Sequence, residues 1–204
     1  MKADKEWSVV KFDEQAAKPE HSISVGVSAC LLGNKVRFDG GHKRDRFVTD
    51  SLSDCFNLVP FCPEVAIGMG IPRQPIRLVG NPQDPRAVGV KQPDLDVTAE
   101  LKAYGKQVGK RIDKLSGFIL KKDSPSCGMT RVKVYNQHGM AERTGTGLFA
   151  NELLKADPLL PVEEEGRLND VHLRENFITR VFVYARWKLM IAEGLSKSAL
   201  IRFH

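Results

Sequence analysis

Residues 23–33 read ISVGVSACLLG, and this stretch decides the fold of the chain. Its first six residues, 23–28, are a short apolar run rich in β-branched side chains, which predicts a strand. The run leads straight into Cys30 and a turn that closes at Gly33. Ligands of open α/β sheets bind at the carboxyl ends of the strands, so this turn is a candidate for the functional edge of a sheet.

The same arrangement of strand and cysteine recurs twice along the chain. Residues 58–61 predict a second strand, which runs directly into Cys62 of the sequence CPE. Residues 117–120 predict a third strand, followed by the turn SPSCG that contains Cys127. If the three strands are parallel, the three thiols meet at one edge of the sheet.

Helical and hairpin signals separate these strands. Apolar residues recur at helical spacing over 45–56, 97–115 and 148–156, and residues 76–90 predict a β-hairpin around a Pro-rich turn. Residues 132–135 predict a further strand. The alternation of strands and helices predicts a three-layer α/β domain with a largely parallel sheet.

The composition divides the chain into four parts. We expect a flexible leader at 1–21, the α/β domain at 22–157, a linker at 158–168 and a helical extension at 169–204. The extension contains a long amphipathic pattern from Asp170 to Ala192, and a second helical pattern is cut off at the last residue. The fold class expected is therefore α/β followed by a partial all-helical extension, the start of a truncated second domain.

Charge is distributed unevenly along the chain. The net charge is +6, of which +4 lies in residues 167–204 and +2 in the other 166 residues. A basic excess of this kind suits contact with a polyanion, although a solvated helix face gives the same count. The sequence has no apolar run long enough to span a membrane and no signal-peptide pattern at its start, so we expect a cytoplasmic protein with no membrane partner.

The chain has four cysteines, Cys30, Cys55, Cys62 and Cys127. Nothing in the sequence indicates secretion, so a disulfide framework is not expected. A structural zinc site needs four ligands, commonly from C-x-x-C pairs, and the chain has no such pair. Three cysteines on three loops suit a 4Fe–4S cluster with one iron left without a protein ligand. The residues alone leave the alternative open that all three are buried thiols at strand ends.

Four motifs, in order, resemble the family of TudS-type thiouracil desulfidases. They are SACLLGNKVRFDGG, CPEVAIGMGIPRQP, GFILKKDSPSCG and GTGLFANELL, and together they span essentially the whole predicted α/β domain. The last fifth of the chain, from LPVEEEGRLNDVHLRENFITRVFVYARWK onward, resembles the start of a helical domain that is often fused behind this one.

The resemblance implies a 4Fe–4S cluster on Cys30, Cys62 and Cys127. It also implies catalytic roles for Glu64, of the CPE sequence, and Ser124, the first serine of SPSCG. Cys55 matches no motif of the family and is expected to be a core thiol on a helix face.

The chemistry of these residue types fits the implied reaction. The soft thiocarbonyl sulfur would bind the open iron, which makes the ring carbon electrophilic. Glu64 lies two residues from a cluster ligand and could activate a water or protonate a ring nitrogen. Ser124 could relay a proton or hold the uracil edge. The sulfur leaves as hydrosulfide, so no net electron transfer is needed.

Four further residues are candidates for substrate binding. Asp39 and Gly40 could form a turn against the substrate, or simply a tight loop. Lys121 could meet a phosphate or a uracil oxygen, or it could merely terminate a strand. Ser126, in the SPSCG turn, completes the set.

The function expected is desulfuration of thiouracil, most simply of 4-thiouridine in tRNA, because the basic tail suits a polyanion and a modified base can be splayed out of RNA. The alternatives are a desulfidase of the free thiouracil base and a non-catalytic iron–sulfur sensor. A sensor would not need Glu64 and Ser124, whereas a desulfidase would.

Overall fold

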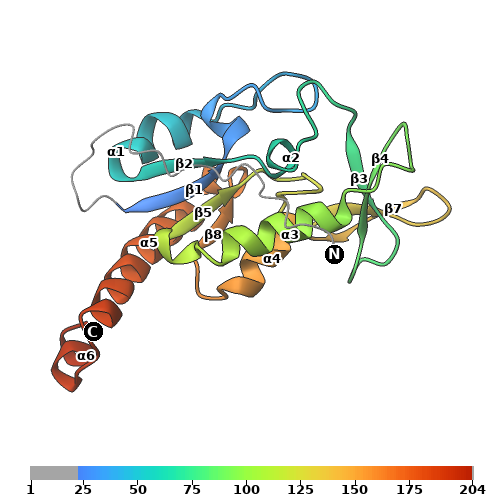
Figure 1. The fold of residues 1–204 in the computed structure, drawn as a ribbon. Coiled ribbons are helices and arrows are strands. Elements are labelled where there is room, and N and C mark those ends of the chain that lie inside the picture. Colours follow the sequence, from blue (N-terminus) through green and yellow to red (C-terminus); the bar gives the residue numbers. More distant parts are fainter. Residues whose placement is uncertain (1–22, 204) are drawn as a thin grey trace.

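The computed structural model describes residues 23–203, so the predicted leader at 1–21 lies outside the described residues. Its main sheet has the strand order β2-β1-β5-β8, and all three strand pairs are parallel. The strands are β1 (Ser24–Ser28), β2 (Asn57–Phe61), β5 (Gly117–Leu120) and β8 (Val162–Glu164). The three predicted strands and their parallel arrangement are confirmed (Figure 1).

A second, smaller sheet has the order β4-β3-β6-β7. Strands β3 (Ile76–Val79) and β4 (Arg86–Gly89) form the predicted hairpin, and β6 (Val132–Tyr135) pairs with β3 in parallel. Strand β7 (Ala141–Gly145) pairs antiparallel with β6. The sequence did not predict β7, because four of its five residues are exposed and it shows no apolar alternation.

Helices cover both faces of the main sheet, which confirms the three-layer architecture. One face carries α3 (Thr98–Gly109) and α4 (Leu148–Ala156), and the other carries α5 (Val171–Ala192) and the helical turns at Phe47–Leu52. Shorter helices are α1 (Ser53–Cys55), α2 (Pro63–Ala66) and α6 (Lys197–Phe203), with 3-10 turns at Ala29–Leu32, Ile112–Lys114 and Arg167–Asn169.

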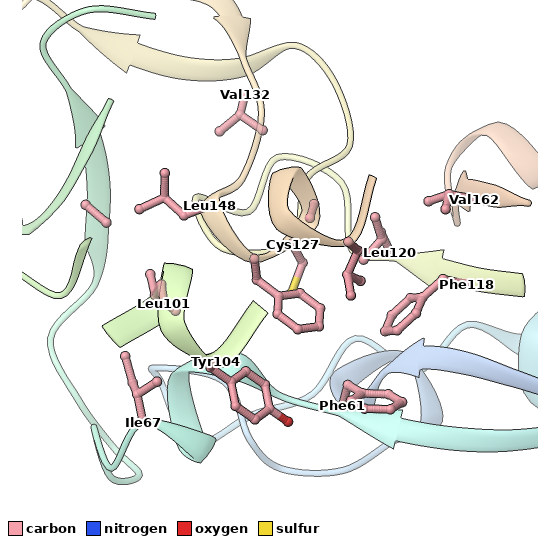
Figure 2. Packing of buried hydrophobic residues seen from close by; sticks show 14 of the residues in the cluster. Phe61, Ile67, Leu101, Tyr104, Phe118, Leu120, Cys127, Val132, Leu148 and Val162 are labelled. Carbon is pink, nitrogen blue, oxygen red and sulfur yellow. The ribbon is translucent and has the colours of Figure 1, made fainter. Parts of the chain in front are cut away.

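Side-chain alternation along β5 explains how one strand serves two cores. Phe118 and Leu120 point to the α3–α4 side, where they pack with Phe61 and Tyr104 (Figure 2). Ile119 points to the other side. Successive residues of a strand face opposite sides of the sheet, so each layer buries its own apolar set.

The segment 158–168 is not the linker that its composition predicted. It contributes β8, which pairs with β5 at the edge of the main sheet. The three consecutive glutamates at 163–165 lie in this predicted linker, yet each is under 10% exposed. Partners inside the protein compensate their burial. Arg167 pairs with Glu163 from four residues away, whereas the partners of Glu164 and Glu165 lie far away in the sequence, in the loop after β5.

The helical extension begins as part of the α/β core. Helix α5 starts where the pattern predicted, with Asp170 accepting a hydrogen bond from the Leu173 N–H at 3.0 Å. Phe177 and Val181 are buried in the second core cluster. A Cβ at Gly117 would lie 2.7 Å from the Val181 side chain, so glycine at the start of β5 lets the helix approach the sheet.

The second half of α5 and α6 extend away from the sheet, toward the end of the molecule opposite to β3, β4 and β7 (Figure 1). Within residues 23–203, the helices are all too short or too polar to cross a bilayer.

Candidate functional site

A cavity of about 360 Å³ lies at the carboxyl ends of β1, β2 and β5. The thiols of Cys30, Cys62 and Cys127 all line it. Glu64 and Ser124, the two predicted catalytic residues, line it too. The parallel register of the three strands therefore brings together residues that are up to 97 positions apart in the sequence.

Cys30 and Cys62 are positioned by the helical turns that follow their strands. Cys30 lies on the 3-10 turn directly after β1, and its carbonyl oxygen accepts a hydrogen bond from the Lys43 N–H at 2.9 Å. Cys62 is the residue before α2, whose first residue is Pro63. Proline is favoured at that position because its fixed φ suits the first helical turn. The Cys62 Sγ lies 3.8 Å from the Val36 carbonyl oxygen.

Cys127 lies in a loop that its own serine holds in shape. The Ser124 Oγ accepts hydrogen bonds from the backbone N–H groups of Ser126 and Cys127, at 3.2 and 3.1 Å. The start of α4 packs against this loop, and a Cβ at Gly147 would lie 2.5 Å from the Ser126 carbonyl. The close approach explains why the last residue of the GTG sequence, Gly147, is a glycine.

Burial raises the pKa values of all three thiols. For Cys30 the pKa rises to about 11, chiefly through burial and the nearby Cys62, while Lys121 and Arg37 act in the opposite direction. Burial also raises the pKa of Cys62, against hydrogen bonds from the first amides of α2, and raises that of Cys127 well above its usual range. Protonated thiols are poor nucleophiles, whereas metal coordination deprotonates a thiol outright. The trio therefore suits metal ligation better than covalent catalysis.

Glu64 is held from two sides. Arg73 donates from Nε and Nη2 to the Glu64 Oε2, at 2.9 and 2.8 Å. The Ser126 hydroxyl donates to Oε1 at 2.7 Å. The Arg73 side chain is 5% exposed and also donates to the carbonyls of Val36 and Gly70. These charge-assisted hydrogen bonds fix the carboxylate in place at the wall of the cavity.

The buried glutamates of β8 and the residue after it hold the loop that carries Cys127. The Glu164 Oε1 accepts the Met129 N–H at 2.8 Å, and Glu165 accepts the Lys122 N–H at 2.8 Å. Glu165 also forms an ion pair with Lys121. The loop is thus fastened at both ends to the neighbouring strand, which keeps the third thiol and Ser124 in register with the other two.

This fastening predicts the effect of two substitutions at Glu164. Glu164→Ala should lower the free energy of unfolding by about 1–3 kcal/mol, because it leaves the Met129 N–H without an acceptor. Glu164→Gln should retain most of the stability, since the amide oxygen still accepts. Burial raises the pKa of Glu164, so its ionisation costs stability as pH rises, and the Gln variant should lose this dependence. Urea unfolding at several pH values measures both effects, and equal stability of the two variants would contradict the assignment.

The four predicted substrate-binding residues have different surroundings. Lys121 lines the cavity beside the cysteines. Asp39 and Gly40 do not line it: Asp39 is exposed, accepts the Gly41 N–H at 3.0 Å and lies 3.4 Å from the Nε of Arg37, which does line it. Ser126 is fully buried behind Glu64 and also does not line the cavity.

The structure corrects the expectation for Cys55 and adds a role for Arg73 that the sequence did not assign. Cys55 was expected to be a core thiol, but it is exposed, because Leu52 and Phe56 take the buried face of this helical segment. The contribution of Arg73 was missed. Its only sequence signal is its place in the loop of the CPEVAIGMGIPRQP motif, and its pairing with Glu64 depends on how that loop folds back.

The residues around the cavity fit an iron–sulfur cluster. Among residues 23–203 no group of three or more His, Cys, Asp or Glu side chains is close enough to share a single metal ion. A 4Fe–4S cluster binds each thiolate through a different iron, so its ligands stand apart. The buried Tyr104 hydroxyl has no hydrogen-bond partner in the described part of the chain, and its burial, followed by the nearby Cys62 and Cys127, raises its pKa. A buried tyrosine hydroxyl usually has an acceptor, and sulfur between these cysteines would supply one.

Comparison with known proteins agrees with this site. The family model described as 2-thiouracil desulfurase matches residues 25–165. Protein YbbK of Bacillus subtilis (strain 168) is 32% identical over 157 residues, which cover 71% of this chain and 97% of YbbK. The structure of the [4Fe-4S]-dependent thiouracil desulfidase TudS is similar at a TM-score of 0.59 and 31% identity, over 76% of this chain and 98% of that one. The chain belongs to the 2-thiouracil desulfurase family.

Proposed function

We propose that this protein is a 4Fe–4S-dependent enzyme that removes the sulfur of a thiouracil without net electron transfer. The observation that carries the proposal is that Cys30, Cys62 and Cys127 line one cavity together with Glu64 and Ser124. The [4Fe-4S]-dependent enzyme TudS, which is similar over 98% of its length, supports the same cofactor and reaction here.

The three thiolates would hold the cluster and leave one iron without a protein ligand. When bound, the cluster supplies a soft Lewis acid for the thiocarbonyl sulfur and makes the ring carbon electrophilic. The cavity volume of about 360 Å³ lies within the range typical of small-ligand sites.

Glu64 is placed to handle the proton of the attacking water. Because Arg73 and Ser126 hold its carboxylate, it does not need to reorganise when the substrate arrives. Ser124 has a complementary role. Its oxygen already accepts two backbone N–H groups, so its own proton is free to be donated to the uracil edge.

The atoms balance with water as the co-reactant. The water oxygen forms a bond to the ring carbon, and the carbon–sulfur bond breaks with its electron pair on sulfur. One proton of the water passes through Glu64 to the departing sulfur, which leaves as hydrosulfide, and the second proton is released to solvent as the ring carbonyl of uracil forms. No external oxidant or reductant takes part.

We propose 4-thiouridine in tRNA as the substrate, with the free thiouracil base as the second candidate. The net positive charge of the chain and the accessibility of a splayed base in RNA support the first. A sensor without turnover is the third candidate, and it gives no reason for the hydrogen bonds that hold Glu64 at the cavity wall.

The test compares two substrates on protein reconstituted with iron and sulfide in the absence of oxygen. We expect hydrosulfide release from both thiolated tRNA and free 4-thiouracil. Turnover of the tRNA at subsaturating concentration should fall steeply with salt, with a slope near 0.7 to 0.9 per phosphate contact, and turnover of the neutral base should not. The same salt dependence for both would favour the free base, and no hydrosulfide from either despite an intact cluster would favour a sensor.

A further inference from the structure

Three cations lie in a row across the outer face of the second sheet. Lys133 on β6 and Arg143 on β7 are directly paired across the strands. In the parallel β3–β6 ladder, Leu78 pairs with Val134. Arg77 comes one residue before Leu78 and Lys133 one residue before Val134, so these two cations also lie side by side. Leu78 and Val134 are buried, so the alternating positions Arg77 and Lys133 face outward. We call Arg77, Lys133 and Arg143 the cationic row.

The row is electrostatically incomplete in the protein alone. Like charges directly opposite on neighbouring strands repel, and Lys133 and Arg143 are such a pair. Arg143 has one compensating partner, Asp123, at 2.9 Å. The guanidinium of Arg77 lies 5.2 Å from the centre of the Tyr135 ring, and its buried Nε has no hydrogen-bond partner among residues 23–203.

The row surrounds a hollow that adjoins the cysteine cavity. The hollow has a volume of about 270 Å³ and is lined by all three cations and by Tyr135. Ile76, Asp123 and Pro125 line both the hollow and the cysteine cavity, so the two spaces share a wall. The two spaces are therefore close enough for one ligand to place a ring in the cavity and an anion in the hollow.

The basic residues of the C-terminal helices are poorer candidates for a polyanion. Arg167 pairs with Glu163 at 2.7 Å, and Lys188 donates to the Leu115 carbonyl at 2.7 Å. Arg174 and Arg186 lie over the rings of Phe47 and Phe203, at 4.7 and 5.4 Å. The cationic row has comparable partners of its own, Asp123 and Tyr135, so position separates the two sets. Helix α6 lies at the far end of the molecule from the second sheet, whereas the row lines a hollow that shares a wall with the cysteine cavity (Figure 1).

We propose that the cationic row binds the phosphodiester backbone of the RNA strand that presents its thiolated base to the cysteine cavity. The proposal rests on the proposed function and names the surface that the RNA occupies. Two arginines can each grip phosphate oxygens with parallel N–H donors, and the lysine adds a point charge between them. The net charge of the hollow, three cations against Asp123, suits one or two phosphates.

The test uses the full chain with its cluster and two matched triple variants. Arg77→Gln/Lys133→Gln/Arg143→Gln removes the row. Arg180→Gln/Lys197→Gln/Arg202→Gln removes three cations from the C-terminal helices, with the same change of net charge. The row variant should bind thiolated tRNA at least about tenfold more weakly, and its salt slope should fall by about two to three. The control variant should stay within about twofold of the unmodified protein.

Free 4-thiouracil separates this proposal from the proposed function. The row variant should turn over the free base at an unchanged rate, which also shows that the variant is folded and holds its cluster. Arg77→Lys/Arg143→Lys, which keeps the charge, should retain most of the salt slope. If the unmodified protein released hydrosulfide from neither thiolated tRNA nor free 4-thiouracil, the proposed function itself would be wrong, whatever the row variant does.

Three results would overturn the proposal while leaving desulfuration intact. The first is an unchanged tRNA affinity and salt slope in the row variant, and the second is a larger loss in the control variant. The third is that the row variant loses turnover of 4-thiouridine monophosphate but keeps its affinity for thiolated tRNA, which would make the hollow a site for a free nucleotide.

Discussion

Replacing Cys30, Cys62 or Cys127 by Ala should each abolish the iron–sulfur cluster and all hydrosulfide release. Each thiol comes from a different strand end, and burial keeps each protonated until a metal displaces the proton. Unmodified protein reconstituted without oxygen should bind about four irons and show the broad visible absorbance of thiolate-ligated iron–sulfur centres. Iron and sulfide analysis with visible spectroscopy makes the measurement.

Cys55→Ala provides the matched control, because Cys55 is exposed and does not line the cavity. That variant should keep its iron, its spectrum and its rate. Stoichiometric zinc in place of iron in anaerobic protein, or an intact spectrum after loss of any one of the three cavity cysteines, would exclude the proposed ligand set.

Glu64→Gln and Ser124→Ala should each reduce the rate by at least about a hundredfold while the cluster remains, since this is the scale for a positioned proton-transfer group. Glutamine keeps the hydrogen bond that Ser126 donates but cannot accept the water proton. Ser124→Ala removes the free proton and the acceptor for two backbone N–H groups, but Glu164 and Glu165 still fasten the loop that carries Cys127, so the cluster should remain. Single-turnover rates on free 4-thiouracil measure the loss without any contribution from RNA binding.

Asp39→Asn is the control for this pair, because Asp39 carries a charge close in sequence to the cavity residues but does not line the cavity. It should change the rate by no more than a few fold. Near-full turnover of both the Glu64 and the Ser124 variants would show that neither handles the proton, even if the cluster is present.

Local sequence patterns were sufficient to predict the strands and helices whose buried apolar residues recur at a regular spacing. The strand at 24–28, the hairpin at 76–89 and the helix over 171–192 all follow their hydrophobic periodicity. The same patterns failed where burial depends on partners rather than on periodicity. Strand β8 reads as polar, and Glu164 and the following Glu165 are buried where the 121–130 loop supplies amide and ammonium donors, while Arg167 pairs with Glu163.

The sequence by itself made the three cysteines candidates, because each lies directly after a predicted strand, and the resemblance to the desulfidase family implied roles for Glu64 and Ser124. Only the tertiary structure decided which polar residues join them. Arg73 contacts Glu64 because a loop folds back, and Arg77, Lys133 and Arg143 align because three strands pair in one register. A motif contains residues that are adjacent along the chain, whereas the cationic row forms only when strands that are distant in the sequence pair with one another. Strand pairing is settled by long-range packing that no local window contains.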